Sequence, residues 1–498
     1  MSKIKTLASG VSWGAFSTVA VTGFQLVFMA VMARLLDPAN FGLVAIANVS
    51  LRFFSYFAQL GTAPALIQKP TLEQGDIAAA LTVSLGISSL FFGLALITAP
   101  IFESFYQMPG LGAVIQVLSI NFIIGGFSVV SVGLLRRKTA FRALAIIEVI
   151  SYVIGYGIVG LGAAHYGLQV WALVAAFMTQ TTLTAVLSYA MIRHSLSFKH
   201  SAAQRRHFFS YGGRYSLIGF IEFLTSNLDG IIIGKLLGAS PAGFYNRAIL
   251  LANLPVQQPA NILTKVLFPI MSSIGDQHDK QTTSLQLSTL LVGSYAFAVS
   301  VGIFVAAPDI VKVVLGNKWL DSIPILKMLA LSVGPLYISH VAGVTLDSMN
   351  KLRIKLRIQL SMLLLLVGLL VWLAANGTAV DIAAAVVITE WVRVGIMTIV
   401  LTRVLRMSIK SIVLIIICIA VVAISCGSII YLTIDLIDAN FTNTIRSSTI
   451  KLSAEIFAGA IGLLIGGLIT RYIAIRLPAM RFLIERSPRF AKLFPKYA

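Results

Sequence analysis

The feature that most constrains this chain is a series of apolar runs, each long enough to cross the hydrocarbon core of a bilayer as one α-helix. The chain has 498 residues, of which 58% are hydrophobic and 11% charged, and its mean hydropathy is +0.92. This composition leaves too little polar surface for a soluble protein of such length. The alternating pattern of membrane β-strands is absent. We therefore predict an all-α polytopic membrane protein.

We expect about 14 transmembrane helices, each recognised as an apolar stretch between short polar connections. The seventh and eighth are the most polar of these stretches. The predicted spans are residues 11–33, 42–67, 77–101, 111–135, 143–163, 168–192, 211–234, 245–272, 284–306, 323–347, 358–376, 380–401, 412–434 and 452–474.

The basic residues predict the orientation of these spans, because cytoplasmic loops are enriched in lysine and arginine. If the N-terminus is cytoplasmic, 26 Lys and Arg residues lie in inside segments, 6 in outside segments and 6 within spans. We therefore predict that both termini are cytoplasmic. The net charge of +20 is accounted for by this topology and by anionic lipid headgroups, so we expect no nucleic-acid partner.

A repeat divides the chain. Arg34–Gly42 closes the first span and opens the second, and Lys235–Phe244 does the same for the seventh and eighth, about 201 residues later. Each has a cation, two leucines, a turn with proline and small residues, and a Gly/Phe pair. We predict two parallel six-helix lobes around a central cavity, plus two C-terminal helices. The predicted domains are an N-lobe at 1–207, a C-lobe at 208–406, and 407–498 with the last two spans and a basic cytoplasmic tail.

Charged residues inside the spans are functional candidates, because a charge at the bilayer centre costs roughly 2.5–3.5 kcal/mol and usually faces a protein interior or a wet cavity. More cations than carboxylates would give the cavity a positive potential, and guanidinium groups suit a diphosphate. An intramembrane carboxylate could bind a coupling cation or change protonation. The candidate substrate-binding cations are Arg52, Arg214, Arg247 and Lys265, and the ion-coupling candidates are Glu222 and Asp229.

The same charges have a structural interpretation, since they could pair with one another or extend to the interface from span ends. Glu390 and Arg393 are three residues apart on one predicted helix, and we expect them to form such a pair. Gly462 and Gly466 form a GxxxG pattern that is typical of close helix packing. Amide side chains could contact sugar hydroxyls, and these candidates are Gln59, Asn227 and Gln257.

Catalysis is not expected. The chain has no phosphate-binding GxxxxGK[ST] loop and no zincin or nucleophile-elbow motif. Its two cysteines, Cys418 and Cys426, lie eight residues apart in one apolar run, which is too far for a disulfide and unsuited to a metal. We therefore predict a protein that is not an enzyme and that uses no cofactor or metal.

Several short stretches of the chain stand out by their order and spacing. They are Ala33–Asp37 with Phe41–Gly42, Gln59–Gln68, Leu135–Phe141 with Glu148, Asn227–Asp229, Leu237–Ala239 with Ala242–Asn246, Val266–Pro269 and Gly316–Trp319. In this order they are similar to the Wzx-type polysaccharide flippases of the colanic-acid and xanthan exporter kind, within the multidrug/oligosaccharidyl-lipid/polysaccharide exporter superfamily. The resemblance covers residues 1 to about 350.

This resemblance implies that the first, second, seventh and eighth spans line the cavity. It implies that the substrate is an undecaprenyl-diphosphate-linked oligosaccharide, moved across a bacterial inner membrane by alternating access for exopolysaccharide biosynthesis. The implied partners are this lipid-linked oligosaccharide, membrane lipid, a polysaccharide polymerase and a chain-length regulator. Two alternatives stay open. A cation-coupled drug antiporter of the same superfamily would favour an acidic cavity, and a non-transporting scaffold for polysaccharide assembly would not need charges inside its spans.

Overall fold

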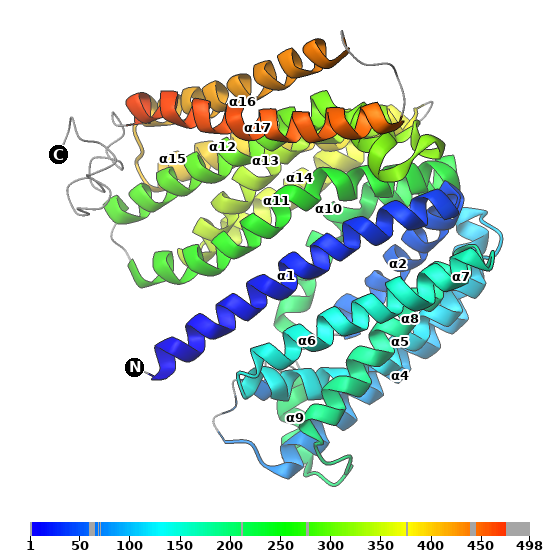
Figure 1. Cartoon of the computed structure of the whole chain (residues 1–498). Coiled ribbons are helices and arrows are strands. Elements are labelled where there is room, and N and C mark those ends of the chain that lie inside the picture. Colours follow the sequence, from blue (N-terminus) through cyan, green and yellow to red (C-terminus); the bar gives the residue numbers. More distant parts are fainter. Residues whose placement is uncertain are drawn as a thin grey trace. The chain divides into compact units, whose positions relative to one another are not determined.

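The computed structural model describes residues 2–58, 65–67, 69, 71–210, 213–274, 278–374, 377–438 and 445–474. Every regular element in these ranges is a helix (Figure 1), which confirms the predicted all-α polytopic fold. In a bilayer this is the expected outcome, because a helix satisfies its backbone hydrogen bonds within one segment.

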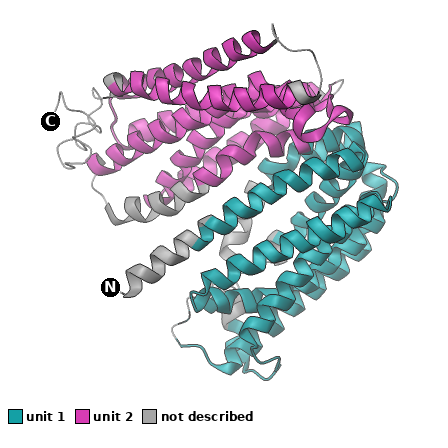
Figure 2. Cartoon of the chain, viewed as in Figure 1, with its two compact units in different colours: residues 1–246 teal, residues 247–498 magenta. Residues whose placement is uncertain are grey.

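The chain forms two compact units, Met1–Asn246 and Arg247–Ala498 (Figure 2). Helix α11 (Ala239–Ile274) begins in unit 1 and continues into unit 2. The other helices of unit 1 are α1 (Ser2–Leu35), α2 (Pro38–Ala58), α4 (Gln74–Tyr106), α5 (Leu111–Arg137), α6 (Phe141–Tyr152), η1 (Val153–Gly160), α7 (Leu161–His165), α8 (Val170–Ile192), α9 (Ala202–Ser210) and α10 (Gly213–Leu237).

Unit 2 consists of helices that follow one another with short connections. They are α12 (His278–Ile310), η2 (Val311–Leu315), η3 (Asn317–Trp319), α13 (Ser322–Ser348), α14 (Leu352–Ala374), α15 (Ala379–Val404), α16 (Ile409–Asp438) and α17 (Ile445–Ala474). The sequence analysis places α10 in the C-lobe, whereas the structure packs α10 on α2 within unit 1. The domain boundaries after residues 207 and 406 stay a prediction.

Eleven helices within the described ranges are long and apolar enough to cross a membrane. The predicted count of 14 is not confirmed. The three predicted spans outside this apolar set correspond to α2, α10 and α11, which are helices of 21, 25 and 36 residues. These three helices also carry all the candidate site residues that lie in described helices.

Helices α4 and α5 of unit 1 approach each other closely. The hydroxyl of Ser84 donates to the carbonyl oxygen of Gly126 at 2.7 Å, and a Cβ on Gly126 would overlap the side chain of Ser88. Small residues allow this approach, as is usual between membrane helices. Around it lies a buried cluster of Ala65, Leu66, Ala79, Ala80, Leu81, Val83, Val130 and Leu134.

The predicted fifth span forms one continuous helical rod with a π-helical segment in its middle, η1 between α6 and α7. Tyr152 and Tyr156 stack there with ring centroids 4.7 Å apart. Phe28 of α1 lies against Tyr152 at 6.0 Å, and a Cβ on Gly157 would meet the Phe28 ring. The glycine therefore provides the space that lets α1 pack on this span.

Helices α16 and α17 of unit 2 pack through the GxxxG pattern, as the sequence predicts. A Cβ on Gly462 would lie 2.5 Å from Cα of Cys426, and one on Gly466 would lie 2.7 Å from Cα of Val422. Cys418 and Cys426 are both buried and free. The last two spans therefore pack on each other with their backbones close together.

Candidate functional site

The two repeated turns of the sequence meet in unit 1, where the start of α2 packs on the start of α11. A Cβ on Gly42 would overlap the carbonyl oxygen of Ala239, and a Cβ on Gly243 would overlap the carbonyl oxygen of Pro38. Each added Cβ would also approach the backbone nitrogen of the other glycine, at 3.0 Å and 3.2 Å respectively. Only glycine at both positions permits this separation of the two helices.

The two contacts are reciprocal. Gly243 follows Gly42 by 201 residues, and Ala239 follows Pro38 by the same 201 residues. Gly42 of the first turn contacts Ala239 of the second, and their equivalents Gly243 and Pro38 make the same contact in reverse. Such exchanged contacts are characteristic of a two-fold arrangement. The offset equals that of the repeated turns, so this geometry supports the internal repeat. Both glycines lie within the repeat that the sequence predicts, but their contact was not predicted.

Further along α2 from this contact, apolar side chains of α2 pack on α10. The rings of Phe53 and Phe223 are 6.4 Å apart in an edge-on arrangement, and a Cβ on Gly234 would overlap the side chain of Ile46. Lys235, at the end of α10, donates to the carbonyl oxygen of Phe105 at 2.5 Å. The cation of the second turn is therefore used to hold α4 and α10 together.

Asp229 is the predicted ion-coupling residue whose surroundings the structure describes. Its side chain lies on α10 with the residue 5% exposed, and the hydroxyl of Tyr245 on α11 donates to its carboxylate. A buried carboxylate needs such donors, because burial without them costs free energy. Sequence reasoning did not select Tyr245 as a site residue. The feature of the sequence that could have indicated Tyr245 is its position in the family-like stretch Ala242–Asn246, beside the second turn.

The other candidates in unit 1 have different surroundings. Arg52 lies exposed on α2. Asn227 is half-buried on α10 and its amide donates to the carbonyl oxygen of Phe223 at 2.8 Å, a bond within its own helix. The side chains of Arg214 and Glu222, and the whole of Gln59, lie outside the described residues.

The remaining candidates lie on the part of α11 that belongs to unit 2. Arg247 is half-buried, Gln257 is exposed, and the side chain of Lys265 lies outside the described residues. The proposed cavity cations are therefore divided between the two units, and their meeting in one cavity stays a prediction. Glu390 and Arg393 form the expected ion pair on α15 at 2.9 Å, which confirms their pairing.

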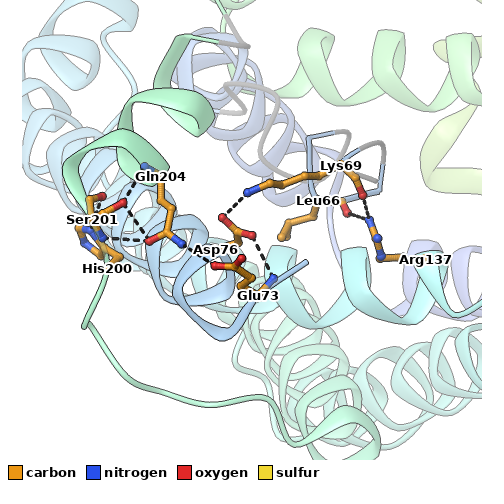
Figure 3. Close-up of polar contacts among 8 residues, drawn as sticks. All are labelled: Leu66, Lys69, Glu73, Asp76, Arg137, His200, Ser201 and Gln204. Atoms are coloured by element: carbon orange, nitrogen blue, oxygen red, sulfur yellow. Dashed lines mark hydrogen bonds and ion pairs between the residues drawn. The ribbon is translucent and has the colours of Figure 1, made fainter. Parts of the chain in front are cut away.

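A polar network at the other end of unit 1 joins two of the family-like stretches (Figure 3). The guanidinium of Arg137 donates to the carbonyl oxygens of Leu66, Ile67 and Lys69 at 2.7, 3.3 and 2.5 Å. The ammonium of Lys69 pairs with Asp76, which is fully buried at the start of α4. This network fixes the connection between α2 and α4 on the end of α5. Arg137 lies in the family-like stretch Leu135–Phe141, but neither Arg137 nor Lys69 was predicted from the sequence to hold this connection.

The family-like stretches thus meet in pairs. The first turn meets the second turn, Asp229 meets Tyr245, and Arg137 meets the end of Gln59–Gln68. In unit 2, Gly316 has φ +96°, a conformation that favours glycine, and Trp319 is completely buried just after it. The described residues contain no group of three or more His, Cys, Asp or Glu side chains arranged to hold a metal ion.

The fold has relatives among solved structures. The structure described as "Lipid II flippase MurJ, inward closed conformation" matches with a TM-score of 0.70 and 13% identity, over 94% of this chain and 100% of that chain. An inward-facing multidrug resistance MATE family transporter of the MOP superfamily matches with a TM-score of 0.55 and 15% identity, over 80% of this chain and 94% of that chain. At such identities the likeness shows the fold alone, which is that of the MOP transporters.

The sequence comparison is more specific. The model of a family described as "Polysaccharide biosynthesis protein" matches residues 31–324, more than half of the chain, and the chain belongs to that family. It is 25% identical to lipopolysaccharide biosynthesis protein WzxC of Escherichia coli over 66% of this chain and 67% of that protein. It is 26% identical to succinoglycan biosynthesis transport protein ExoT of Rhizobium meliloti over 68% of this chain and 70% of that protein.

The family match and these relatives confirm the predicted resemblance to Wzx-type proteins of polysaccharide biosynthesis, and the fold is one that MurJ and a MATE family transporter also have. The chain is a multi-pass membrane protein of the polysaccharide biosynthesis family. ExoT is named as a transport protein and MurJ as a flippase, in agreement with the prediction that this chain is not an enzyme.

Proposed function

We propose that this protein is a flippase for undecaprenyl-diphosphate-linked oligosaccharide repeat units. It moves them from the cytoplasmic to the outer leaflet of a bacterial inner membrane, for the biosynthesis of an exopolysaccharide of the xanthan or colanic-acid kind. Support comes from the family, and from relatives named for lipopolysaccharide and succinoglycan biosynthesis. Both termini are cytoplasmic in this proposal, and the polymerase and chain-length regulator of the same pathway are its protein partners.

The observation that carries the mechanism is the reciprocal contact of Gly42 and Gly243. The predicted topology places both turns at the outer surface. Alternating access requires an outer closure formed by symmetry-related elements, and two turns that meet through backbone and glycine provide a closure with no large side chain to rearrange. Opening this contact would give the substrate its exit.

The charged residues supply the binding part of the proposal. Arg52, Arg214, Arg247 and Lys265 would hold the diphosphate by charge-assisted hydrogen bonds. Asp229, with Tyr245 donating to it, is placed between α10 and α11, so a cation or proton on the carboxylate would act on the hairpin that carries Gly243. Glu222 is the second candidate for such coupling.

The test uses a strain that lacks the gene, complemented with wild type, Arg52→Ala, Arg52→Lys or Lys410→Ala at equal membrane abundance. Lys410 is an exposed cation in a predicted cytoplasmic connection and serves as the charge-matched control. Secreted polysaccharide is measured together with lipid-linked oligosaccharide on the cytoplasmic face, by mass spectrometry. We expect Arg52→Ala to lower polymer about tenfold and to trap precursor, Arg52→Lys to lie between, and Lys410→Ala to match wild type.

A null strain that makes normal polymer and traps no precursor would refute the flippase proposal. The antiporter interpretation would then be the one to examine, by measuring drug efflux in the same strains.

A further inference from the structure

The connection between α8 and α10 is strongly basic. From Arg193 to Ser210 it contains four Arg or Lys residues and three histidines, and no acidic residue occurs between Glu148 and Glu222. All four cations are exposed, namely Arg193, Lys199, Arg205 and Arg206. Such a segment attracts anions, and nothing in its own sequence neutralises it.

This connection is fastened to unit 1 at its beginning. The ring of His194 is buried, and its Nε2 lies 3.0 Å from the hydroxyl of Ser131 on α5. The rings of Phe127 and Tyr189 lie against the same imidazole, at 6.3 and 5.3 Å. The chain therefore leaves α8 in a defined direction, along the end of α5.

It is fastened again at α9. The amide of Gln204 donates to the carboxylate of Glu73 at the start of α4 at 3.5 Å (Figure 3). A Cβ on Gly75 would overlap the amide of Gln204. The backbone nitrogen of Ser201 donates to the amide oxygen of Gln204 at 2.9 Å, which caps the start of α9. The segment between His194 and Gln204 is thus held at both ends.

Between the two attachments lie two exposed apolar side chains. Leu196 is 45% exposed and Phe198 is 61% exposed, in a stretch without helix or turn. They are two residues apart, the spacing that places side chains on one side of an extended segment. The hydroxyls of Ser195 and Ser197 accept from the backbone nitrogens two residues ahead, at 3.2 and 3.1 Å, and so hold the segment in shape.

The position of this segment at the end of α8 indicates that its cations and its exposed apolar side chains both face the membrane interface. It begins where the apolar helix α8 ends, on the side predicted to be cytoplasmic. The end of a helix that spans the hydrocarbon core is expected at the headgroup level of a bilayer. Exposed aromatic and aliphatic side chains beside cations are the composition of segments that lie in the membrane interface. Arg136 and Lys138, exposed at the end of α5, extend the positive charge around the attachment at Ser131.

We propose that residues 193–206 are an interfacial anchor that binds the phosphate groups of anionic phospholipids. Leu196 and Phe198 enter the upper acyl region, and the four exposed cations pair with headgroup phosphates. Because the segment is fastened to α4 and α5, bound lipid holds the connection between the two predicted lobes at the membrane surface. This inference does not depend on the transported substrate.

The experiment places an environment-sensitive fluorophore on Phe198→Cys in the full-length protein. Native Cys418 and Cys426 are buried, and the labelling background is set with unsubstituted protein. The protein is reconstituted in phosphatidylcholine vesicles with or without phosphatidylglycerol, and quenching by nitroxide lipids labelled near the headgroup is measured. Tyr166→Cys is the control position, since it is 84% exposed and no Arg or Lys occurs between Arg142 and Arg193.

We expect quenching at position 198 to rise about twofold when phosphatidylglycerol is included, and position 166 to show no such rise. Replacing the four cations with glutamine should abolish the rise. Removing four other exposed cytoplasmic cations of unit 2 should leave it intact, and these are Lys351, Arg353, Arg403 and Arg406.

Three results would overturn the proposal. The first is a label at position 198 that stays in water in both vesicles. The second is quenching at position 198 that is the same with and without phosphatidylglycerol and is not changed by the glutamine substitutions. The third is loss of quenching when soluble diphosphate is added, which would mean that the site takes a soluble phosphate and not a lipid headgroup.

Discussion

Gly42 and Gly243 lie at equivalent places in the two repeated turns, and each is packed against the backbone of the other turn. The chain thereby brings its two repeats together at glycines, with helix backbones in direct contact. Neither glycine has a positive φ, so the space for a missing Cβ, and not backbone freedom, is what requires glycine at both positions.

This relationship predicts that Gly42→Ala is harmful although alanine favours helices. The added Cβ would overlap the Ala239 carbonyl, and overpacking costs about 1–3 kcal/mol. Gly230→Ala on α10 is the control, since its Cβ would meet nothing within 4 Å and alanine gains up to about 1 kcal/mol of helix propensity. The melting temperature in detergent and the amount of secreted polysaccharide should both fall for Gly42→Ala, and neither should fall for Gly230→Ala. Equal melting temperatures for both variants would contradict the packing.

The bond between Tyr245 and Asp229 predicts coupling between these two residues. Tyr245→Phe removes the donor and leaves a buried carboxylate with one fewer hydrogen bond, which should cost about 1–3 kcal/mol. Combined with Asp229→Asn in a double-mutant cycle, it should show an interaction energy of about 0.5–3 kcal/mol in unfolding. The pH profile of export by Tyr245→Phe should shift if the pair takes part in ion coupling. Strictly additive substitutions would show that the two side chains act independently.

The Arg137 network predicts that a single arginine holds the connection between α2 and α4. Arg137→Gln removes the charged donor to three carbonyl oxygens, and a hydrogen bond to a charged group contributes about 1.5–3 kcal/mol. Hydrogen exchange in peptides that cover residues 65–73 should become at least tenfold faster. Arg136→Gln, an exposed neighbour with the same charge, should leave this exchange unchanged. Similar exchange in both variants would mean that the ion pair of Lys69 with the buried Asp76 is enough to hold the connection.

The contact of α16 and α17 offers a test with adjacent positions. Gly466→Leu would press against the backbone of Val422, whereas a Cβ added at Gly467 would meet nothing within 4 Å, so that Gly467→Leu starts into open space. We expect Gly466→Leu to lower the melting temperature of the purified protein by several degrees and Gly467→Leu to leave it within about one degree. A larger fall in melting temperature for Gly467→Leu than for Gly466→Leu would mean that α17 contacts α16 through another face.

Local patterns in the sequence were sufficient for several of these features. The apolar runs predict helices because a membrane leaves few alternatives for the backbone, and the described residues confirm this. Glu390 with Arg393 and Gly462 with Gly466 were also recognised, since residues three or four apart share a helix face. The repeat was visible because both turns use the same residue types.

The candidate site was harder to predict. Tyr245 was overlooked because a tyrosine in an apolar helix usually packs, and nothing near it in sequence indicates that it faces Asp229, 16 residues away. Asn227 was chosen for sugar contact, whereas its amide bonds to its own helix. For Arg52, the structure gives an exposed position and leaves its role as a substrate-binding cation to experiment.

The sequence by itself determined that this is an all-helical membrane protein with an internal repeat, since helix formation and membrane insertion depend on residues close together along the chain. Tertiary structure alone decided which distant residues meet: Gly42 with Gly243, Asp229 with Tyr245, and Arg137 with the carbonyls of Leu66 to Lys69. The physical reason is that apolar membrane helices carry little information about their partners. Their pairing is selected by shape and by a few buried hydrogen bonds, which exist only after the helices have packed.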